Sequence, residues 1–522
     1  MTRVRMTRLF LGVLFLSFIF QAAAAVTLPR VLSSHMVLQR DMPVPVWGTA
    51  AAGEKVTVTF REQHKIAVAD AQGRWLVKLD PLQPGEPATL TVAGSTTVTL
   101  KDVLVGEVWV GSGQSNLDTD VPDYVQHDPV LNAAWNKSYP KLRLFRSDVG
   151  AGWQEANRQT LGRFSAQLFF FGLKLQEALD VPVGVMEGAV RGSPSGPWLS
   201  RQAFQTDPDI RKAVAAADAK DPLEARMRKY DEALKKWQQN LAAAKTAGTP
   251  EDKLPKEPRK PASFGERKTG DLYETHIRPM IPYAIRGVLW DQGEGGTGLD
   301  PIWQPVVMTA LIRAWRADWG QGDFPWLVVE KPSGMGAALN PEDPVNLGCA
   351  PVSPLPKDPP GWQPGWPPRW DWLKIKDIAP NVFLVITSDL ATGVHPPNKS
   401  GYGTRDCRVA LGAVYGQPVE FYGPLYQAVK VEGGKLRLTF MHVGKGLTVP
   451  PGQTLQGFMI AGEDKKFHWA DAVIEGPTVV LSSPVVPAPV AARYAWAPFD
   501  ITWANLFNAD GLPALTFRTD AW

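Results

Sequence analysis

The sequence is poor in the residues that bind metals and form disulfides. Its 522 residues include two cysteines and seven histidines, and no Cys/His cluster has the spacing of metal ligands. We therefore predict no metal site. Cys349 and Cys407 could pair in an oxidising compartment, but the sequence does not show that they meet.

The sequence also lacks an excess of charge of one sign. It has 55 basic and 52 acidic residues, a net charge of +3, which gives no electrostatic reason to expect a nucleic acid or an anionic membrane as partner. Hydrophobic residues make up 44%, as in globular proteins. A chain of this length is too long for one ordinary core, so two or three domains are expected. Nothing in it indicates an oligomeric state.

Long apolar runs are missing beyond the N-terminus. There, three arginines precede the apolar run Leu9–Phe20, which is short for a membrane span, and residues 21–25 are mostly small. This pattern predicts a signal peptide over residues 1–25, cut just before Val26 or one residue earlier. An uncleaved anchor is the alternative, and the small residues argue against it. We expect a secreted or periplasmic protein that is free of the membrane after cleavage.

The pattern along the mature chain changes twice. Residues 26–102 alternate in short runs between Gly/Pro turns, which predicts an N-terminal β-sandwich domain. Residues 103–416 alternate apolar runs with helical patterns, which predicts an α/β domain with a doubly wound parallel sheet. Residues 417–522 are β-rich again and predict a C-terminal sandwich. The expected strands of the sheet are Val103–Val110, Val181–Met186, Ala284–Trp290, Pro325–Val329 and Val382–Thr387, and the expected helices include Ala166–Leu179 and Val306–Trp319.

Two segments depart from this pattern. Residues 207–262 are charged and alanine-rich, which predicts a helical insertion that is solvated and has no chemical role. Pro351–Trp372 is a proline-rich loop that carries Trp362, Trp366, Trp370 and Trp372. This loop is interpreted either as a wall on which sugars stack or as a loop packed on the surface.

Polar residues follow the expected strands, where an open α/β sheet binds its ligands. Ser115 lies in Gly113-Gln114-Ser115-Asn116 after the first strand, and Gly192 follows the second. Gln292 and Glu294 follow the third, and Asp389 and His395 follow the last. A serine, a carboxylate and a histidine can therefore meet at one sheet edge, which is the arrangement of a catalytic triad.

The chemistry assigns each residue a role. A serine hydroxyl needs a base to take its proton, and His395 is the candidate because imidazole titrates near neutral pH. The backbone N–H groups of Ser115 and Gly192 and the amide of Gln292 are candidates for the oxyanion, with Gln114 and Asn116 beside them. A serine in a glycine-rich turn is more commonly a helix cap, and the Gly-x-Ser-x-Gly elbow is absent. Spacing alone leaves both readings open.

The motifs in their order resemble the sialate O-acetylesterase family, among the SGNH-type carbohydrate esterases. The resemblance covers most of the mature chain and rests on seven blocks: His35–Gly48, Gly106–Asn116, Phe164–Gly184, Leu272–Glu294, Trp319–Pro325, His395–Lys399 and Arg493–Asp520.

The resemblance implies a fold and a reaction. The fold would be an SGNH-hydrolase-like α/β core flanked by two β-sandwich domains. Ser115 would be the nucleophile and His395 the base, with Gly192, Gln292 and backbone N–H groups at the oxyanion. The reaction would remove O-acetyl groups from an O-acetylated carbohydrate through an acyl-enzyme, without a cofactor.

The chain departs from the family pattern at three places. The family usually has an aspartate two or three residues before the histidine, where this chain has Thr392 and Gly393. Glu294, which related esterases use to orient the histidine, or Asp389 would then be the third member of the triad, and we favour Glu294. Gly295-Gly296 replaces a common Ser-Asn pair, and Arg191 replaces a glycine.

These departures leave two other functions open. One is a catalytically degenerate relative that binds glycans through its tryptophan-rich surface. The other is an acetylesterase that acts on a plant polysaccharide such as xylan or pectin.

Overall fold

A computed structural model describes residues 25–266, 269–331, 333–361, 372–391 and 393–522. Residues 1–24 of the expected signal peptide, Thr392, and Trp362, Trp366 and Trp370 of the proline-rich loop lie outside these ranges. Within them, no helix combines the length and the apolar character that a membrane crossing requires.

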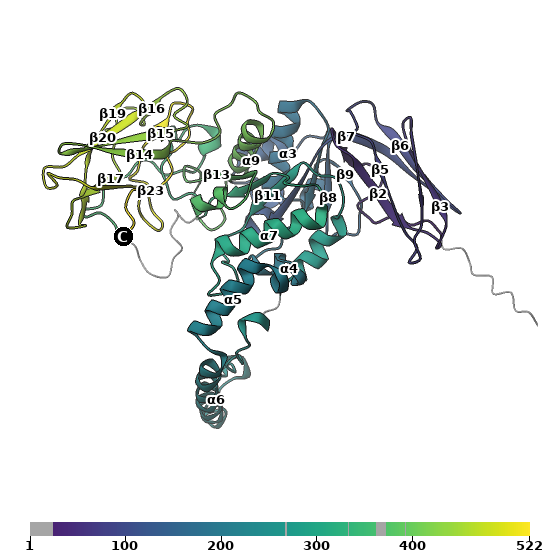
Figure 1. The fold of residues 1–522 in the computed structure, drawn as a ribbon, viewed down its shortest axis with the longest axis horizontal. Helices are drawn as coiled ribbons and strands as arrows, with labels where there is room; N and C mark the ends of the chain where they lie inside the picture. The colour runs from purple at the N-terminus through teal and green to yellow at the C-terminus, as the bar shows by residue number, and fades with distance from the viewer. Residues whose placement is uncertain (1–24, 267–268, 332, 362–371, 392) are drawn as a thin grey trace, which may run out of the picture.

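A central sheet of mostly parallel strands forms the middle of the molecule (Figure 1). Its order is β13-β12-β11-β7-β10-β8-β9, and every neighbouring pair is parallel except β8 and β9. The predicted α/β class with a parallel sheet is confirmed. The strands are β7 (Thr97–Gly113), β8 (Tyr139–Arg146), β9 (Gln154–Ala156), β10 (Val183–Glu187), β11 (Gly287–Asp291), β12 (Trp326–Val329) and β13 (Val382–Val385).

Helices cover both faces of this sheet (Figure 1). On one face lie α3 (Ala166–Leu179) and α9 (Lys399–Val409), whose apolar side chains share a core with the sheet. The other face is covered by α7 (Gln304–Trp319). Helix α3 begins where the Ser165 hydroxyl accepts a hydrogen bond from the Leu168 N–H, a standard N-cap. Shorter helices are α1 (Ser115–Asp118), α2 (Pro129–Trp135), α4 (Arg201–Thr206) and α5 (Pro208–Lys220).

Several of the many tryptophans form the core under α7. Trp290, Trp315 and Trp326 are fully buried, and their ring centroids lie 5.1 to 6.1 Å apart. Trp198 packs edge-on against Trp290 at 6.1 Å. Aromatic pairs in this geometry add stability beyond the area that they bury. These four tryptophans therefore hold the sheet and are not available to a ligand.

The N-terminal strands continue into the central sheet without a break. The first half of β7 pairs with β6 (Ala88–Ala93), and its second half pairs with β10 and β11. The expected domain boundary after residue 102 thus falls inside β7. Burial explains the pattern seen in the sequence, since β7 alternates up to Asp102 and is fully buried from Val103 on. The other N-terminal strands are β1 (Val37–Gln39), β2 (Val44–Thr49), β3 (Lys55–Phe60), β4 (Gln63–Val68) and β5 (Arg74–Leu79).

The C-terminal part consists of antiparallel sheets that bury a common core. One sheet has the order β14-β15-β20-β19 and another β18-β17-β21-β23. The strands are β14 (Leu425–Glu432), β15 (Lys435–Met441), β16 (Leu447–Thr448), β17 (Phe458–Ala461), β18 (Phe467–Trp469), β19 (Asp471–Glu475), β20 (Thr478–Ser482), β21 (Ala491–Tyr494), β22 (Phe507–Asn508) and β23 (Phe517–Arg518).

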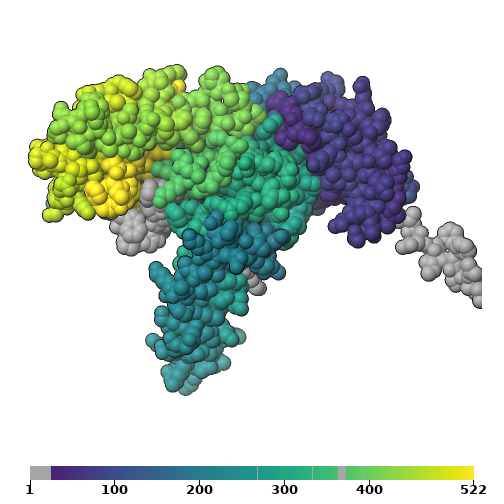
Figure 2. Space-filling view, in the orientation of Figure 1, coloured from purple at the N-terminus to yellow at the C-terminus, as the bar shows by residue number. Residues whose placement is uncertain are grey.

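The predicted helical insertion forms an arm that projects from the body (Figures 1 and 2). Its longest helix, α6 (Leu223–Thr246), has no buried residue. The indole N–H of Trp237 donates to the carbonyl of Pro255, which ties the helix to the returning chain.

A buried carboxylate on β7 joins three parts of the chain. Glu107 is fully buried and accepts hydrogen bonds from Arg40 at 2.6 Å and Arg286 at 2.8 Å. Gln39 and the Tyr415 hydroxyl, each at 3.0 Å, complete its surroundings. The N-terminal segment, the sheet and the chain after α9 are thus held at one point.

Replacing Glu107 with alanine should destabilise the protein strongly. The change leaves the Arg40 and Arg286 guanidinium groups without their counter-charge, and breaking a buried ion pair costs about 3 kcal/mol or more. A lower midpoint of thermal unfolding by calorimetry would show this loss. Glu155→Ala, at a half-exposed carboxylate with a 3.7 Å ion pair, is the control and should change the midpoint little. Equal midpoints for Glu107→Ala and the wild type would contradict the prediction.

Candidate active site

Ser115 lies where the central strand of the sheet ends. Gly113, the last residue of β7, has a φ of +135°, and a Cβ there would lie 2.1 Å from the Asp291 carbonyl oxygen. Only glycine therefore fits between β7 and β11 at this point. The next N–H, of Gln114, donates to the same Asp291 carbonyl at 2.9 Å, and α1 begins at Ser115. This turn lifts the half-buried Ser115 side chain out of the sheet edge.

His395 comes to Ser115 from the other end of the sheet. It lies in the loop between β13 and α9, and its Nε2 is 2.8 Å from the Ser115 Oγ. In the tautomer with the proton on Nδ1, the serine donates to this nitrogen. The structure thus brings together the two residues that the sequence predicted as nucleophile and base. The imidazole is exposed, so it is open to substrate and water.

Asn116 connects the serine turn to the histidine loop. Its amide nitrogen donates to the Val394 carbonyl at 3.1 Å, one residue before His395, and to Glu294 Oε1 at 3.4 Å. Its amide oxygen accepts a hydrogen bond from Lys399 at 2.8 Å. All of its polar atoms are engaged, so Asn116 acts here as a brace and its amide does not point freely at a substrate.

Glu294 binds both neighbours of Ser115. Its carboxylate accepts hydrogen bonds from the side chains of Gln114 and Asn116 and pairs with Lys331 at 2.9 Å. Among the described residues, no carboxylate is hydrogen-bonded to His395. Orientation of the histidine by Glu294 therefore stays a prediction, and the contacts of Glu294 are with the serine turn.

Asp389 lies in a different setting. Arg405 donates to both of its carboxylate oxygens at 2.8 Å, and Asn346 donates to it at 2.9 Å. Asp389 and Arg405 are almost completely buried. Its carboxylate is thus occupied by a structural ion pair, and its role as an alternative third triad member has no contact to support it.

The loop after β10 runs along the serine turn. The N–H of Val190 donates to the Gly113 carbonyl at 3.1 Å, and the N–H of Arg191 donates to Asp118 at 2.8 Å. Gly192, with a φ of +69°, follows on the exposed side. These contacts place Gly192 beside α1, where the sequence predicted an oxyanion donor.

Gln292 is turned into its own loop. Its amide oxygen accepts from the Ser195 hydroxyl at 2.6 Å, and its amide nitrogen donates to the Gly296 carbonyl at 2.8 Å. It is fully buried. In this structure Gln292 holds the loops after β10 and β11 together, and no hydrogen bond links it to Ser115.

Buried charges lie behind the serine turn. Lys331 pairs with Asp291 and Glu294, and although burial lowers the pKa of Lys331, these carboxylates raise it above its ordinary value. Lys399 is fully buried, and burial lowers its pKa to about 8. Burial raises the pKa of the Asp406 carboxyl well above its usual range.

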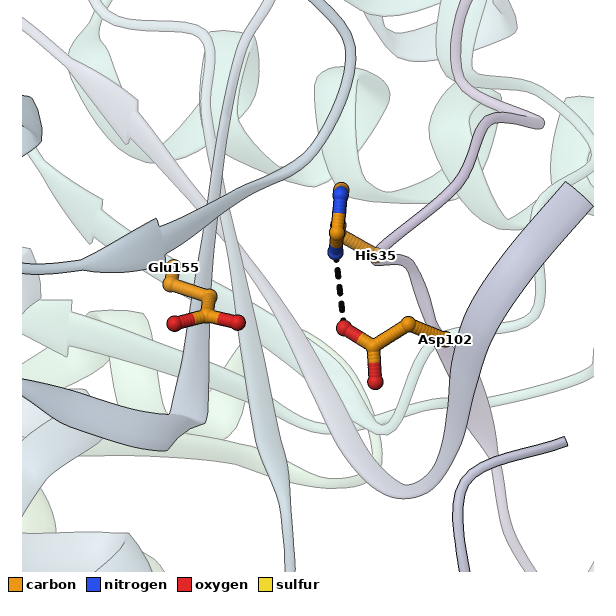
Figure 3. Close-up of side chains that lie close together, drawn as sticks. All are labelled: His35, Asp102 and Glu155. Atoms are coloured by element: carbon orange, nitrogen blue, oxygen red, sulfur yellow. Dashed lines mark hydrogen bonds and ion pairs between the residues drawn. The ribbon is translucent and has the colours of Figure 1, made fainter.

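A second cluster of titratable groups lies away from this site. His35, Asp102 and Glu155 lie close enough to share an ion (Figure 3), and the His35 Nδ1 is 2.7 Å from Asp102. The buried Arg143 guanidinium already lies among them, 2.6 Å from Asp102 and 3.7 Å from Glu155. Because this fixed positive charge stands where a metal would bind, the cluster is an ion-pair network.

Several known proteins are similar to this chain in sequence or in fold over most of its length. Sialate O-acetylesterases of Mus musculus and Pongo abelii are 24% and 23% identical to it, over 90% and 94% of this chain and 89% and 92% of their own. That of Rattus norvegicus is 25% identical over 56% of each chain, so the match spans about half of that relative. A solved carbohydrate acetylesterase of Xanthomonas citri is 27% identical with a TM-score of 0.69, covering 95% of this chain and 100% of that one. No family model matches.

The chain is similar to the sialate O-acetylesterase family. The resemblance inferred from the motifs is thereby confirmed, and the names of these relatives support an esterase that acts on acetylated carbohydrates. The buried lysines Lys331 and Lys399 are the part of the site that the sequence did not predict. Lys399 ends the His395–Lys399 block, and Lys331 follows the end of β12. In the sequence, their positions at the end of a strand and at the end of a loop were the pattern that could have indicated a place in the site.

A buried carboxyl group also lies near the site, at the end of β10. Glu187 accepts a hydrogen bond from the Ser165 N–H at 3.0 Å and lies 3.7 Å from Arg146. Burial is the main cause that raises the pKa of Glu187 from 4.5 to about 8. Between these two values the folded protein keeps this proton and the unfolded chain releases it, so stability falls as pH rises through the window.

The variant Glu187→Gln should remove this pH dependence. Glutamine is neutral at every pH, so the variant should melt at a higher temperature than the wild type at pH 8.5, and the two should differ less at pH 5. Thermal unfolding at both pH values measures the difference. The exposed Glu177→Gln is the control and should show the same offset at both. An offset for Glu187→Gln that does not grow with pH would refute the prediction.

Proposed function

We propose that this protein is a serine carbohydrate O-acetylesterase in which Ser115 is the nucleophile and His395 the general base. The observation that carries the proposal is the 2.8 Å distance between the Ser115 Oγ and the His395 Nε2, at the carboxyl end of the central strand. This separation is within reach for direct proton transfer.

The proposed reaction has two steps. The Ser115 Oγ attacks the acetyl carbonyl carbon while His395 takes the hydroxyl proton, and the imidazolium then protonates the sugar oxygen as it leaves. In the second step, His395 takes a proton from the water that attacks the acetyl-serine, and it returns this proton to the Ser115 oxygen as acetate leaves. Backbone N–H groups of Ser115 and Gly192 are the proposed oxyanion donors, since Gly192 is exposed and lies on the loop bound to α1.

The substrate class follows from the relatives. Their printed names are sialate O-acetylesterase and carbohydrate acetylesterase, so we propose an O-acetylated sugar as the substrate. A plant polysaccharide ester such as xylan or pectin is the alternative within the same chemistry. The SGNH-type assignment and export by the N-terminal segment belong to this proposal.

Removing either reacting group should abolish turnover. Ser115→Ala and His395→Ala are each expected to lower kcat on 4-nitrophenyl acetate by about a thousandfold or more, because each removes a group that the reaction requires. An organophosphate should label Ser115 in the wild type and label nothing in Ser115→Ala. A wild type without turnover and without labelling would contradict the esterase proposal and favour the catalytically degenerate relative.

Substitutions at Glu294 and at Asp389 should have different effects, the first mainly on activity and the second mainly on stability. Glu294→Gln removes the charge that pairs with Lys331 and disturbs Gln114 and Asn116, so kcat should fall about tenfold or more with a small change in the melting temperature. Asp389→Asn leaves the Arg405 guanidinium buried without its counter-charge. It should lower the melting temperature and keep kcat per folded molecule. Full activity in Glu294→Gln with lost activity in Asp389→Asn would reverse the two roles.

A further inference from the structure

Lys399 is a buried ammonium group whose surroundings do not explain it as a structural residue. It is fully buried, and the Tyr124 and Tyr402 rings lie 5.1 Å from its nitrogen. Among the described residues it makes no ion pair within 4 Å, and the side chain that it contacts by hydrogen bond is Asn116 at 2.8 Å. An unpaired buried charge costs free energy, so a purely structural role would favour an apolar side chain of the same shape.

The hydrogen bond to Asn116 has a directional consequence. A lysine ammonium can only donate, so the Asn116 amide must turn its oxygen toward Lys399. Its nitrogen then faces the Val394 carbonyl at 3.1 Å and Glu294 at 3.4 Å. With the amide reversed, the oxygen would face two acceptors and the link to the histidine loop would be lost. Lys399 thus selects the orientation in which Asn116 can hold this loop.

We propose that Lys399 is a positioning residue for the Ser115–His395 pair, acting through Asn116, which ties the serine turn to the loop that carries the histidine. This inference rests on the proposed esterase function. The titratable groups around Lys399 are Asp291 at the end of β11, Glu294 in the following loop, Lys331 after β12 and Asp406 on α9. At pH 7 the ammonium is in its charged form.

The test combines single and double variants of the full chain in a 4-nitrophenyl acetate assay at pH 7. Lys399→Met keeps the length of the side chain without the donor and should lower kcat about tenfold or more with less than a twofold change in KM. Asn116→Ala should do the same. The double variant should lose no more than the larger single loss, because both changes break one link. The half-buried Lys174→Met on α3, whose ammonium pairs with Glu177, is the control and should keep wild-type kcat.

Thermal unfolding separates positioning from folding. Lys399→Met should melt at or above the wild-type temperature, since it removes an unpaired buried charge. Asn116→Asp gives a second test that leaves Lys399 in place: the carboxylate can bind the ammonium but cannot donate to the Val394 carbonyl. It should lose activity and keep its melting temperature.

The outcomes distinguish the two proposals. Wild-type kcat in Lys399→Met or in Asn116→Asp, or losses that multiply in the double variant, would overturn the role of Lys399 while the esterase function stands. The same holds if Lys399→Met loses activity only in proportion to a lost folded fraction, measured by circular dichroism. An inactive wild type overturns both proposals.

Discussion

Strand β7 is the constraint on which the rest of the molecule depends. One strand, Thr97–Gly113, belongs to the N-terminal sheet in its first half and forms the middle of the central sheet in its second. It ends at Gly113, where only a residue without a Cβ fits against Asp291. The loop after β10 hydrogen-bonds to its last residues, and Asp291 at the end of β11 accepts a hydrogen bond from Gln114, the residue that follows β7. The serine is therefore placed by the centre of the sheet, which has the least freedom to move, and the N-terminal strands extend that rigid element.

Behind the serine turn the protein keeps charge where an apolar core would be more stable. Two carboxylate side chains, Asp291 and Glu294, lie among two buried lysines, Lys331 and Lys399. Groups of opposite charge thus lie near one another, which limits the cost of burying the lysines. Hydrogen bonds to charged groups are the strong ones, and here they fix the orientation of the side-chain amides on both sides of Ser115.

The sequence predicted the features that depend on local pattern. Continuous apolar runs marked the inner strands, helical spacing marked α3 over the residues that it occupies, and strand ends marked Ser115 and His395 as neighbours. Strands β8 and β9 were not predicted, because charged residues interrupt the apolar pattern of Tyr139–Arg146, the strand next to the edge of the sheet. Lys331 and Lys399 escaped because a lysine is normally a surface residue, and its burial depends on partners from distant segments. The sequence also does not predict the contacts of Glu294, since they join loops that follow different strands.

These contacts change how a carboxylate can serve the proposed reaction. In a triad the carboxylate stabilises the imidazolium, which is essential when the histidine is buried in a medium of low dielectric constant. His395 is exposed, so water can solvate its positive charge, and the need for a carboxylate partner is smaller. The reaction then requires above all that the position of the histidine be fixed, because an exposed loop has more conformational freedom than a buried one. Asn116 meets this demand at the Val394 carbonyl, and Glu294 and Lys399 hold Asn116 from its two sides. In the proposed reaction, the carboxylate therefore acts through the position of the serine and histidine. A network that begins at Asn116 takes the place of the aspartate that the family usually has before the histidine.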